Sequence, residues 1–428
     1  MEAGFKKYSI VIGAQKDETT GLYVPAVSEN ELIAILNLCA EKGIDAQIQL
    51  HSNLVREGYN VFTSAFPNIN FKEYSALTGF FIVDEPSWDQ LDYIRDNYVD
   101  WFNDNYANSG LEFYVNLLSG YSTWIGAIRG ADGEYVFDEN GNKLWDNATD
   151  EQKKTCLQAY HEKWLAIFKK INSENKYFTH DAYPLRDNQS GVLTLPDAEL
   201  PEGYERLLSE EWLARSLNIA VQARENGYKY GAYIQAFDQE TNNYRLPTKV
   251  EEIKWQAYMN IALGAKRLVY FGYDQSAGGT YMTSEGEPLP LYYLVQETNA
   301  ELDKVDHVFA AFENWVGVKT FTPTGSEVCE AFQRTADMEL DALTGVSSVT
   351  TDRELVVGEM MDENGNHGYM LVGYDDPYNG NSTQVEMTFE NAEGVIIYRN
   401  GERTLVECTD GKLSITLSAG EGVFVIPV

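Results

Sequence analysis

The sequence is poor in basic residues and in long apolar runs. Its 428 residues contain 32 Lys+Arg and 66 Asp+Glu, which gives a formal net charge of −34. Phosphate recognition needs a basic surface, so this balance excludes a nucleic-acid-binding protein. Apolar runs such as residues 268–273 are far shorter than the roughly 20 residues of a membrane helix. No membrane-spanning segment is therefore predicted.

Cysteine and the common cofactor motifs are scarce as well. The four cysteines form no C-x-x-C pair, which indicates neither a zinc site nor a disulfide framework. The chain has no G-x-G-x-x-G, G-x-x-x-x-G-K-[ST], H-E-x-x-H or G-x-S-x-G sequence. Residues 138–142 and 362–366 alternate Asp and Asn, but they lack the sixth-position glycine and closing glutamate of a calcium loop and are interpreted as turns. No metal and no cofactor are predicted.

The remaining composition is that of a folded protein with two domains. A hydrophobic content of 44% and an aromatic content of 13% exclude intrinsic disorder, and the length favours more than one core. From residue 8 to about 310, short β-rich runs alternate with amphipathic helical patterns, which is typical of repeated βα units. The expected strands are 8–13, 45–51, 79–85, 111–117, 177–181, 230–237 and 266–273.

Seven such strands predict an α/β fold, a (β/α)8 TIM barrel lacking one strand, over residues 1–315. We expect the first strand to be the missing one, because residues 1–5 resemble the end of a helix that leads into a second strand. An export signal would be lost with that strand, so the localisation stays open and a secreted or cell-surface protein fits. A doubly wound sheet is the alternative, although it should bring a glycine-rich turn.

Residues 316–428 show no helical pattern and predict a small all-β sandwich. Runs of five to eight residues are separated by turn signals, and we expect about seven strands. They are 355–361, 367–374, 384–389, 394–398, 404–408, 412–417 and 422–426.

In an α/β barrel the reacting groups lie at the carboxyl ends of the strands. Asp84 and Glu85 end the apolar run 79–83 and are followed by Pro86. Glu85 is therefore the first candidate for catalysis, with Asp84 as a substrate contact. The alternative is that one or both carboxylates cap the helix that begins after Pro86.

The other strand ends supply further carboxylates, amides and aromatic rings. Asp181 is a candidate for catalysis or substrate contact, or else an ordinary hydrogen-bond acceptor in a loop. Gln235 can bind a sugar hydroxyl but cannot act as a base, and it can equally be a buried strand residue. Flat apolar rings beside carboxylates and amides suit pyranose sugars, so we predict a carbohydrate substrate. The candidate contacts are Asp84, His51, Asn116, Trp124, Tyr183, Gln235, Asp238 and Tyr273.

The order of these segments resembles a known family. Asp84-Glu85-Pro86, Asp181-Ala-Tyr183-Pro184, Gln235-Ala-Phe and residues 245–259 together resemble bacterial glycoside-hydrolase-like barrels, including proteins of gut bacteria. These are related to the β-galactosidase-like branch of clan A. The resemblance covers residues 1–310, and the sandwich resembles their accessory β-domain. It implies a glycosidase of polysaccharide degradation with Glu85 as the proton donor at the end of the fourth strand.

The sequence departs from that family where the nucleophile belongs, since Gln235 occupies the end of the seventh strand. Three interpretations remain: Asp238 or Glu240 is the nucleophile, Asp181 acts across a wider gap, or the second carboxylate is lost. Our leading hypothesis is a glycoside hydrolase with Glu85 as acid and Asp181 as base or positioning group. The alternative is a catalytically degenerate carbohydrate-binding barrel. A metal-assisted lyase or aldolase is the third possibility, but it lacks clustered ligands and a strand-end lysine.

Overall fold

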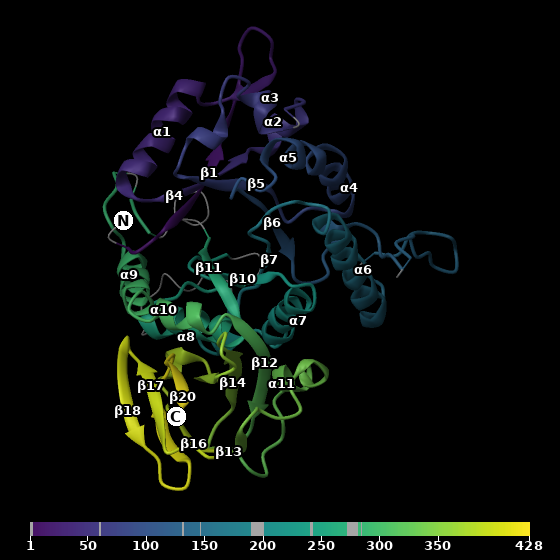
Figure 1. The fold of residues 1–428 in the computed structure, drawn as a ribbon. Coiled ribbons are helices and arrows are strands. Elements are labelled where there is room, and N and C mark those ends of the chain that lie inside the picture. The colour runs from purple at the N-terminus through teal and green to yellow at the C-terminus, as the bar shows by residue number, and fades with distance from the viewer. Residues whose placement is uncertain are drawn as a thin grey trace. The chain divides into compact units, whose positions relative to one another are not determined.

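The computed structural model describes residues 3–59, 61–130, 132–145, 147–189, 201–239, 243–271, 281–283 and 285–428. A seven-stranded sheet has the order β1-β4-β5-β6-β7-β10-β11, and its pairs β1–β4, β4–β5, β5–β6 and β10–β11 are parallel. Figure 1 labels these elements along the chain. The strands are β1 (Lys7–Ile12), β4 (Asp45–Leu50), β5 (Leu77–Asp84), β6 (Glu112–Leu118), β7 (Tyr177–Asp181), β10 (Lys229–Ile234) and β11 (Ala265–Tyr270).

One or more helices separate consecutive strands of this sheet. They are α1 (Glu29–Lys42), α2 (Ser52–Arg56), α3 (Phe62–Ala65), α4 (Trp88–Asn97), α5 (Val99–Tyr106), α6 (Asp150–Phe168), α7 (Trp212–Glu225) and α8 (Val250–Ala262), with α9 (Pro290–Leu302) and α10 (Asp306–Ala311) after β11. The sheet order follows the chain order and never reverses, as in a (β/α)8 barrel and unlike a doubly wound sheet. The predicted fold class is confirmed, with seven parallel strands among the described residues.

The helices begin where local sequence supplies caps. Ser28 caps α1, and the Glu31 side chain returns the bond to the Ser28 backbone. Thr149 and Gln152 form the same capping box at the start of α6. Each box satisfies two backbone donors that a helix start leaves unpaired. The α1 helix ends at Gly43, whose φ of 64° suits glycine.

Short hairpins in the connecting segments were not predicted from the sequence. One pairs β2 (Ala14–Lys16) with β3 (Tyr23–Pro25), and another pairs β8 (Leu185–Asp187) with β9 (Arg206–Leu208). Each strand spans three residues, too few to show the alternation of a longer strand.

The C-terminal region is a sandwich of nine strands and not of about seven. A six-stranded sheet has the order β12-β14-β15-β20-β17-β18, and a three-stranded sheet has the order β13-β16-β19. The unpredicted strands are β12 and β13, and the expected boundary at residues 315 and 316 lies inside β12. Side chains from both sheets share one apolar core. The strands are β12 (Asn314–Phe321), β13 (Val346–Thr351), β14 (Leu355–Met361), β15 (His367–Gly373), β16 (Thr383–Phe389), β17 (Gly394–Arg399), β18 (Glu402–Glu407), β19 (Lys412–Leu417) and β20 (Gly422–Pro427), and a short helix, α11 (Glu330–Gln333), follows β12.

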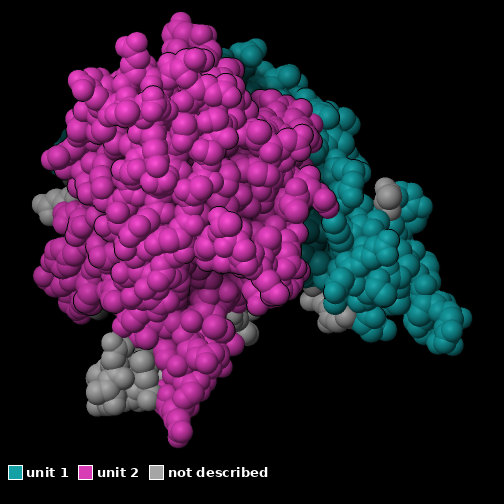
Figure 2. Space-filling view, turned by 90° about the horizontal axis from the view of Figure 1, so that it is seen from below, with its two compact units in different colours: residues 1, 5–178 teal, residues 2–4, 179–428 magenta. Residues whose placement is uncertain are grey.

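The chain divides into two compact units (Figure 2). The first comprises Phe5–Phe178, and the second comprises Thr179–Val428 together with Ala3 and Gly4. The second unit therefore contains the last strands of the parallel sheet and the whole sandwich.

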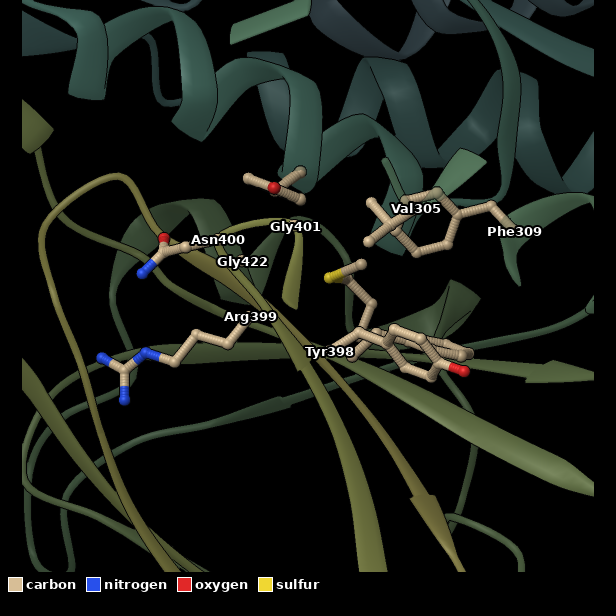
Figure 3. Close-up of a pocket in the computed structure, with 10 residues that line it drawn as sticks. Val305, Phe309, Tyr398, Arg399, Asn400, Gly401 and Gly422 are labelled. Atoms are coloured by element: carbon tan, nitrogen blue, oxygen red, sulfur yellow. The ribbon is translucent and has the colours of Figure 1, made fainter. Parts of the chain in front are cut away.

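Within the second unit, glycine lets the sandwich approach α8 closely. A Cβ atom at Gly358 would overlap the backbone of Ala262, and one at Gly422 would overlap the ring of Tyr258. The Trp255 indole N–H also donates to the carbonyl of Gly373 at 2.9 Å. The hollow left at this junction has no room for a water molecule, so it is packing and not a ligand site. Figure 3 shows its lining, including Val305, Phe309, Tyr398, Arg399, Asn400, Gly401 and Gly422.

Candidate functional site

The turn after β5 holds a strained residue. Glu85 follows the last residue of β5 and has a φ of 45°, in the left-handed region. For a residue that carries a Cβ atom, this conformation costs about 1–2 kcal/mol. Such strain persists only where surrounding contacts impose it, and it is concentrated at functional sites.

Two hydrogen bonds to the backbone of Glu85 hold it in this conformation. Its N–H donates to the carbonyl of Asn116 in β6 at 2.9 Å. Its own carbonyl accepts a hydrogen bond from the Trp124 indole at 2.5 Å. Trp124 itself is 55% exposed, so the indole is fixed by its nitrogen while much of the side chain remains in contact with solvent. The turn is thereby anchored to the strand beside it and to the loop that follows β6.

Asp84 and Asn116 form a hydrogen-bonded pair next to this turn. The Asn116 Nδ2 donates to Asp84 Oδ1 at 2.9 Å. Asn116 is 1% exposed, and its Oδ1 is buried with no hydrogen-bond partner among the described residues. A buried unbonded acceptor of this kind costs about 1–3 kcal/mol. The two strand ends therefore carry a second energetic cost besides the φ of Glu85.

Asp84 is accessible to solvent, yet its ionisation is perturbed. Desolvation by the surrounding protein raises the pKa of its carboxyl, and the hydrogen bond from Asn116 opposes that rise. A small molecule can therefore reach a carboxyl whose charged form is disfavoured by its surroundings. Perturbed carboxyls of this kind are typical of acid–base sites.

Neither carboxylate caps the helix that follows. Ser87 is the N-cap of α4, its side chain accepts from the Gln90 N–H at 3.3 Å, and Gln90 accepts from the Ser87 N–H. The alternative that Asp84 or Glu85 is a helix cap is therefore wrong.

Helix α6 supports the same turn through residues that the sequence did not single out. The Tyr160 hydroxyl donates to the carbonyl of Pro86 at 2.7 Å. The adjacent His161 is fully buried, and its Nε2 lies 2.8 Å from the carbonyl of Leu118 at the end of β6. Burial lowers the pKa of His161 to about 4, so this imidazole is neutral at neutral pH. Only a three-dimensional view connects these helix residues to β5 and β6.

The end of β10 differs in every one of these respects. Gln235 is fully buried, and its Oε1 accepts from the Leu185 N–H at 2.8 Å. Its Nε2 donates to the carbonyls of Leu185 and Arg245 at 2.9 and 2.8 Å. Both amide hydrogens are therefore used within the protein, and none remains for a sugar hydroxyl. This is the buried strand role that the sequence left open, and Gln235 is not retained as a substrate contact.

A buried ion cluster lies beside Gln235. Arg245 is 1% exposed and binds Glu252 of α8 together with both carboxylate oxygens of Asp376, at 2.8 and 2.7 Å. Asp376 belongs to the loop after β15, so one guanidinium connects the barrel half and the sandwich of this unit. The Glu252 carboxylate also accepts the backbone N–H groups of Thr248 and Lys249. The cluster is structural, because every charge in it has a partner.

Two of the remaining predicted residues, His51 and Tyr183, have structural roles. His51 caps α2 through its Nδ1, which accepts from the Asn53 N–H at 3.1 Å. Tyr183 is buried and packs edge-to-face against Phe237 and Tyr244. Asp181 is the half-buried last residue of β7, and the half-buried Asp238 follows β10. Tyr273 and Glu240 lie outside the described residues.

Glu85 belongs to the first compact unit and Asp181 to the second. Their pairing as the two catalytic carboxyls stays a prediction. The residues that the structure does bring together are Asp84, Glu85, Asn116 and Trp124, all in the first unit.

Two comparisons with known proteins give no match: no family model and no curated protein corresponds to this sequence. Solved structures with similar arrangements include alpha-galactosidase I from Mortierella vinacea, with 8% identity, a TM-score of 0.46, and 99% of this chain and 88% of that chain covered. Another is a family 5 glycoside hydrolase from Bacteroides vulgatus, with 9% identity, a TM-score of 0.43, and coverages of 94% and 86%. A GH30 endoxylanase from Clostridium papyrosolvens has 10% identity, a TM-score of 0.35, and coverages of 98% and 99%. At these values the similarities assign no activity to this chain.

Proposed function

We propose that this protein is a glycoside hydrolase whose proton donor is Glu85. The observation that carries the proposal is the strained Glu85 turn, which is held by two hydrogen bonds beside an accessible carboxyl of raised pKa. A turn that served only to connect β5 to α4 would be more stable with glycine or asparagine at this position. The conformational cost is accounted for if the Glu85 carboxyl performs chemistry.

The chemistry of the turn suits acid catalysis of bond cleavage. A protonated Glu85 transfers its proton to the glycosidic oxygen as the bond from that oxygen to the anomeric carbon breaks. Water then adds to the anomeric carbon and gives its proton to a carboxylate. We assign the donor to Glu85 because it occupies the strained position, whereas the Asp84 carboxyl already accepts a hydrogen bond from Asn116.

Trp124 supports a sugar as the substrate. Its indole nitrogen donates to the backbone carbonyl of Glu85, and the side chain is 55% exposed. Sugar rings have apolar C–H faces that stack on flat aromatic surfaces, while their hydroxyls need hydrogen-bond partners. Asp84, which precedes Glu85 in the chain and is accessible to solvent, offers such an acceptor. We assign Trp124 and Asp84 as substrate contacts.

The second carboxylate is proposed to be Asp181, with Asp238 as the other candidate. The clan A barrels that the sequence resembles carry their nucleophile at the end of the seventh strand. At that place, the end of β10, this chain has Gln235, whose amide is fully hydrogen-bonded within the protein. If neither Asp181 nor Asp238 proves necessary, the catalytically degenerate binding protein becomes the better proposal. The distinction is made by turnover, because both functions require binding.

The direct test compares wild type with Glu85→Gln on two kinds of substrate. Hexasaccharides of cellulose, xylan and mannan have poor leaving groups, whereas 2,4-dinitrophenyl glycosides of the same sugars have a good one. We expect kcat on the cleaved hexasaccharide to fall by about 10³-fold, since general acid catalysis contributes roughly 10²–10⁴-fold. The dinitrophenyl substrate should lose far less, because its leaving group needs no proton.

Two further variants make this result specific. Glu57→Gln, at an exposed position after α2, is the matched control and should leave both substrates unaffected. Asp84→Asn tests whether the two neighbouring carboxyls have exchanged roles. Equal losses on good and poor leaving groups in Glu85→Gln would remove Glu85 as the proton donor. Binding of a hexasaccharide with no turnover of any substrate by wild type would favour the binding protein.

A further inference from the structure

The loop that connects β6 to α6 carries an exposed aromatic face. Phe137 and Trp145 are 54% and 48% exposed, and both lie in this one segment, which also contains Trp124. Figure 1 shows the segment extending away from the strands of the first unit near α6. Exposed rings scattered singly are ordinary, but rings that gather in one patch are typical of a binding surface.

Backbone pairing places these rings on one side of a small hairpin. Phe137 pairs with Lys143 in an antiparallel bridge, the Asp138 N–H donates to the Asn142 carbonyl, and the Leu144 N–H donates to the Val136 carbonyl. Alternation along each side of the hairpin then puts Tyr135, Phe137, Lys143 and Trp145 on one face. Val136 and the buried Leu144 lie on the other. We call the first set the hairpin face.

The hairpin face connects to the Glu85 turn through a buried arginine. Arg129 is 8% exposed, and its Cζ lies 3.6 Å from the ring centre of Tyr135 and 4.6 Å from that of Trp88. Trp88 is the first residue of α4, three positions after Glu85. Lys143 also lies over the Tyr135 ring, with its Nζ 3.5 Å from the ring centre. The alternating rings and cations fix the hairpin against the turn that holds the proposed acid.

We infer that the hairpin face is a second sugar-contact surface, so that the substrate is a neutral polysaccharide or long oligosaccharide and not a short glycoside. This inference rests on the proposed function and names its substrate class. The face combines flat rings with the Tyr135 hydroxyl and the Lys143 ammonium, which suits stacked pyranose rings better than the aliphatic surface of a protein partner. The net charge of −34 disfavours an anionic polymer or an anionic membrane. Trp124 belongs to the same connecting loop, between β6 and α6.

The test is binding and turnover of chains of different length. In the Glu85→Gln background, calorimetry measures binding of hexasaccharides and disaccharides of cellulose, xylan and mannan, with and without Phe137→Ala/Trp145→Ala. We expect the double change to weaken the bound hexasaccharide by about tenfold or more, and the matching disaccharide by less than about twofold. Tyr293→Ala, which removes an aromatic ring of 55% exposure in α9, is the matched control and should have no effect.

The possible outcomes distinguish a failure of this inference from a failure of the proposed hydrolase function. If the double change leaves the hexasaccharide affinity unchanged, and the protein that retains Glu85 still cleaves the hexasaccharide, the hairpin face is not a sugar-contact surface. The proposed hydrolase function then still stands. Neither binding nor turnover of any sugar by wild type overturns both. Sedimentation of wild type as a dimer that the double variant dissociates would show that a second copy of the chain covers the face, and would also overturn the inference.

Discussion

The ends of β5 and β10 occupy equivalent places in a parallel sheet but are built in opposite ways. At β5 the structure holds a strained glutamate, an accessible carboxyl and a buried amide oxygen with no partner among the described residues. At β10 the amide of Gln235 is saturated, and Arg245 neutralises two buried carboxylates. The first end is unfavourable for stability and the second is favourable. This contrast supports the proposal that the chemistry takes place at the end of β5, whereas the end of β10 stabilises the fold.

The largest expected effect is on stability, at the β10 end. Arg245→Met leaves Glu252 and Asp376 buried without their cation, and should lower the free energy of unfolding by about 3–5 kcal/mol. Urea titration followed by fluorescence measures the change. Arg95→Met is the control, because Arg95 pairs with Asp92 and Asp96 on the surface and such pairs are worth under about 1 kcal/mol. Similar losses in the two variants would mean that the β10 cluster is not a structural centre.

A second effect concerns pH and the helix that supports the β5 turn. His161 has a pKa lowered from 6.5 to about 4, so the unfolded chain binds a proton more readily than the folded one. Stability from this group is present above pH 6.5 and is lost as the pH falls toward 4, by about 3 kcal/mol in total. Unfolding titrations at several pH values should show a steeper acid loss in wild type than in His161→Gln. Identical pH profiles would contradict a neutral buried imidazole.

The fold follows from the sequence wherever burial fixes the pattern. All seven strands of the parallel sheet were predicted to within a few residues, because each is a short run rich in apolar and β-branched residues that is bounded by turn signals. The two three-residue hairpins and the strands β12 and β13 were missed, since they are short or lie at a sheet edge. The site was predicted only in part. Asp84, Glu85, Asn116 and Trp124 were listed as separate candidates, and the structure brings them together.

Other features of the site have no signal in the sequence. Glutamate is an unusual residue at a positive φ, so nothing in the run 79–86 indicates the conformation of Glu85. Gln235 and Arg245 look like candidate contacts or surface residues until their partners appear, and one of these partners, Asp376, is 131 positions away. Arg129 in the aromatic stack is likewise invisible before the hairpin folds.

The smallest expected effect is at Asp84. Its raised pKa means that the charged form is disfavoured in the folded state, so stability is lost as the pH rises through the folded pKa. Asp84→Asn keeps an oxygen that can accept from Asn116 and should raise the free energy of unfolding at pH 7 by up to about 1 kcal/mol, reduced by solvent screening. The gain should vanish below the ordinary pKa of 3.8. Thermal unfolding at pH 7 and pH 3.5 measures it, and a gain that grows in acid would contradict the assignment.

The central claim is that the strain at Glu85 is kept for the sake of its carboxyl, and Glu85→Asn tests it most directly. Asparagine adopts a positive φ with little strain, so the variant should unfold with a free energy equal to wild type or up to about 1 kcal/mol higher. Turnover of the hexasaccharide should at the same time be lost. A variant that is less stable than wild type and still active would contradict the account.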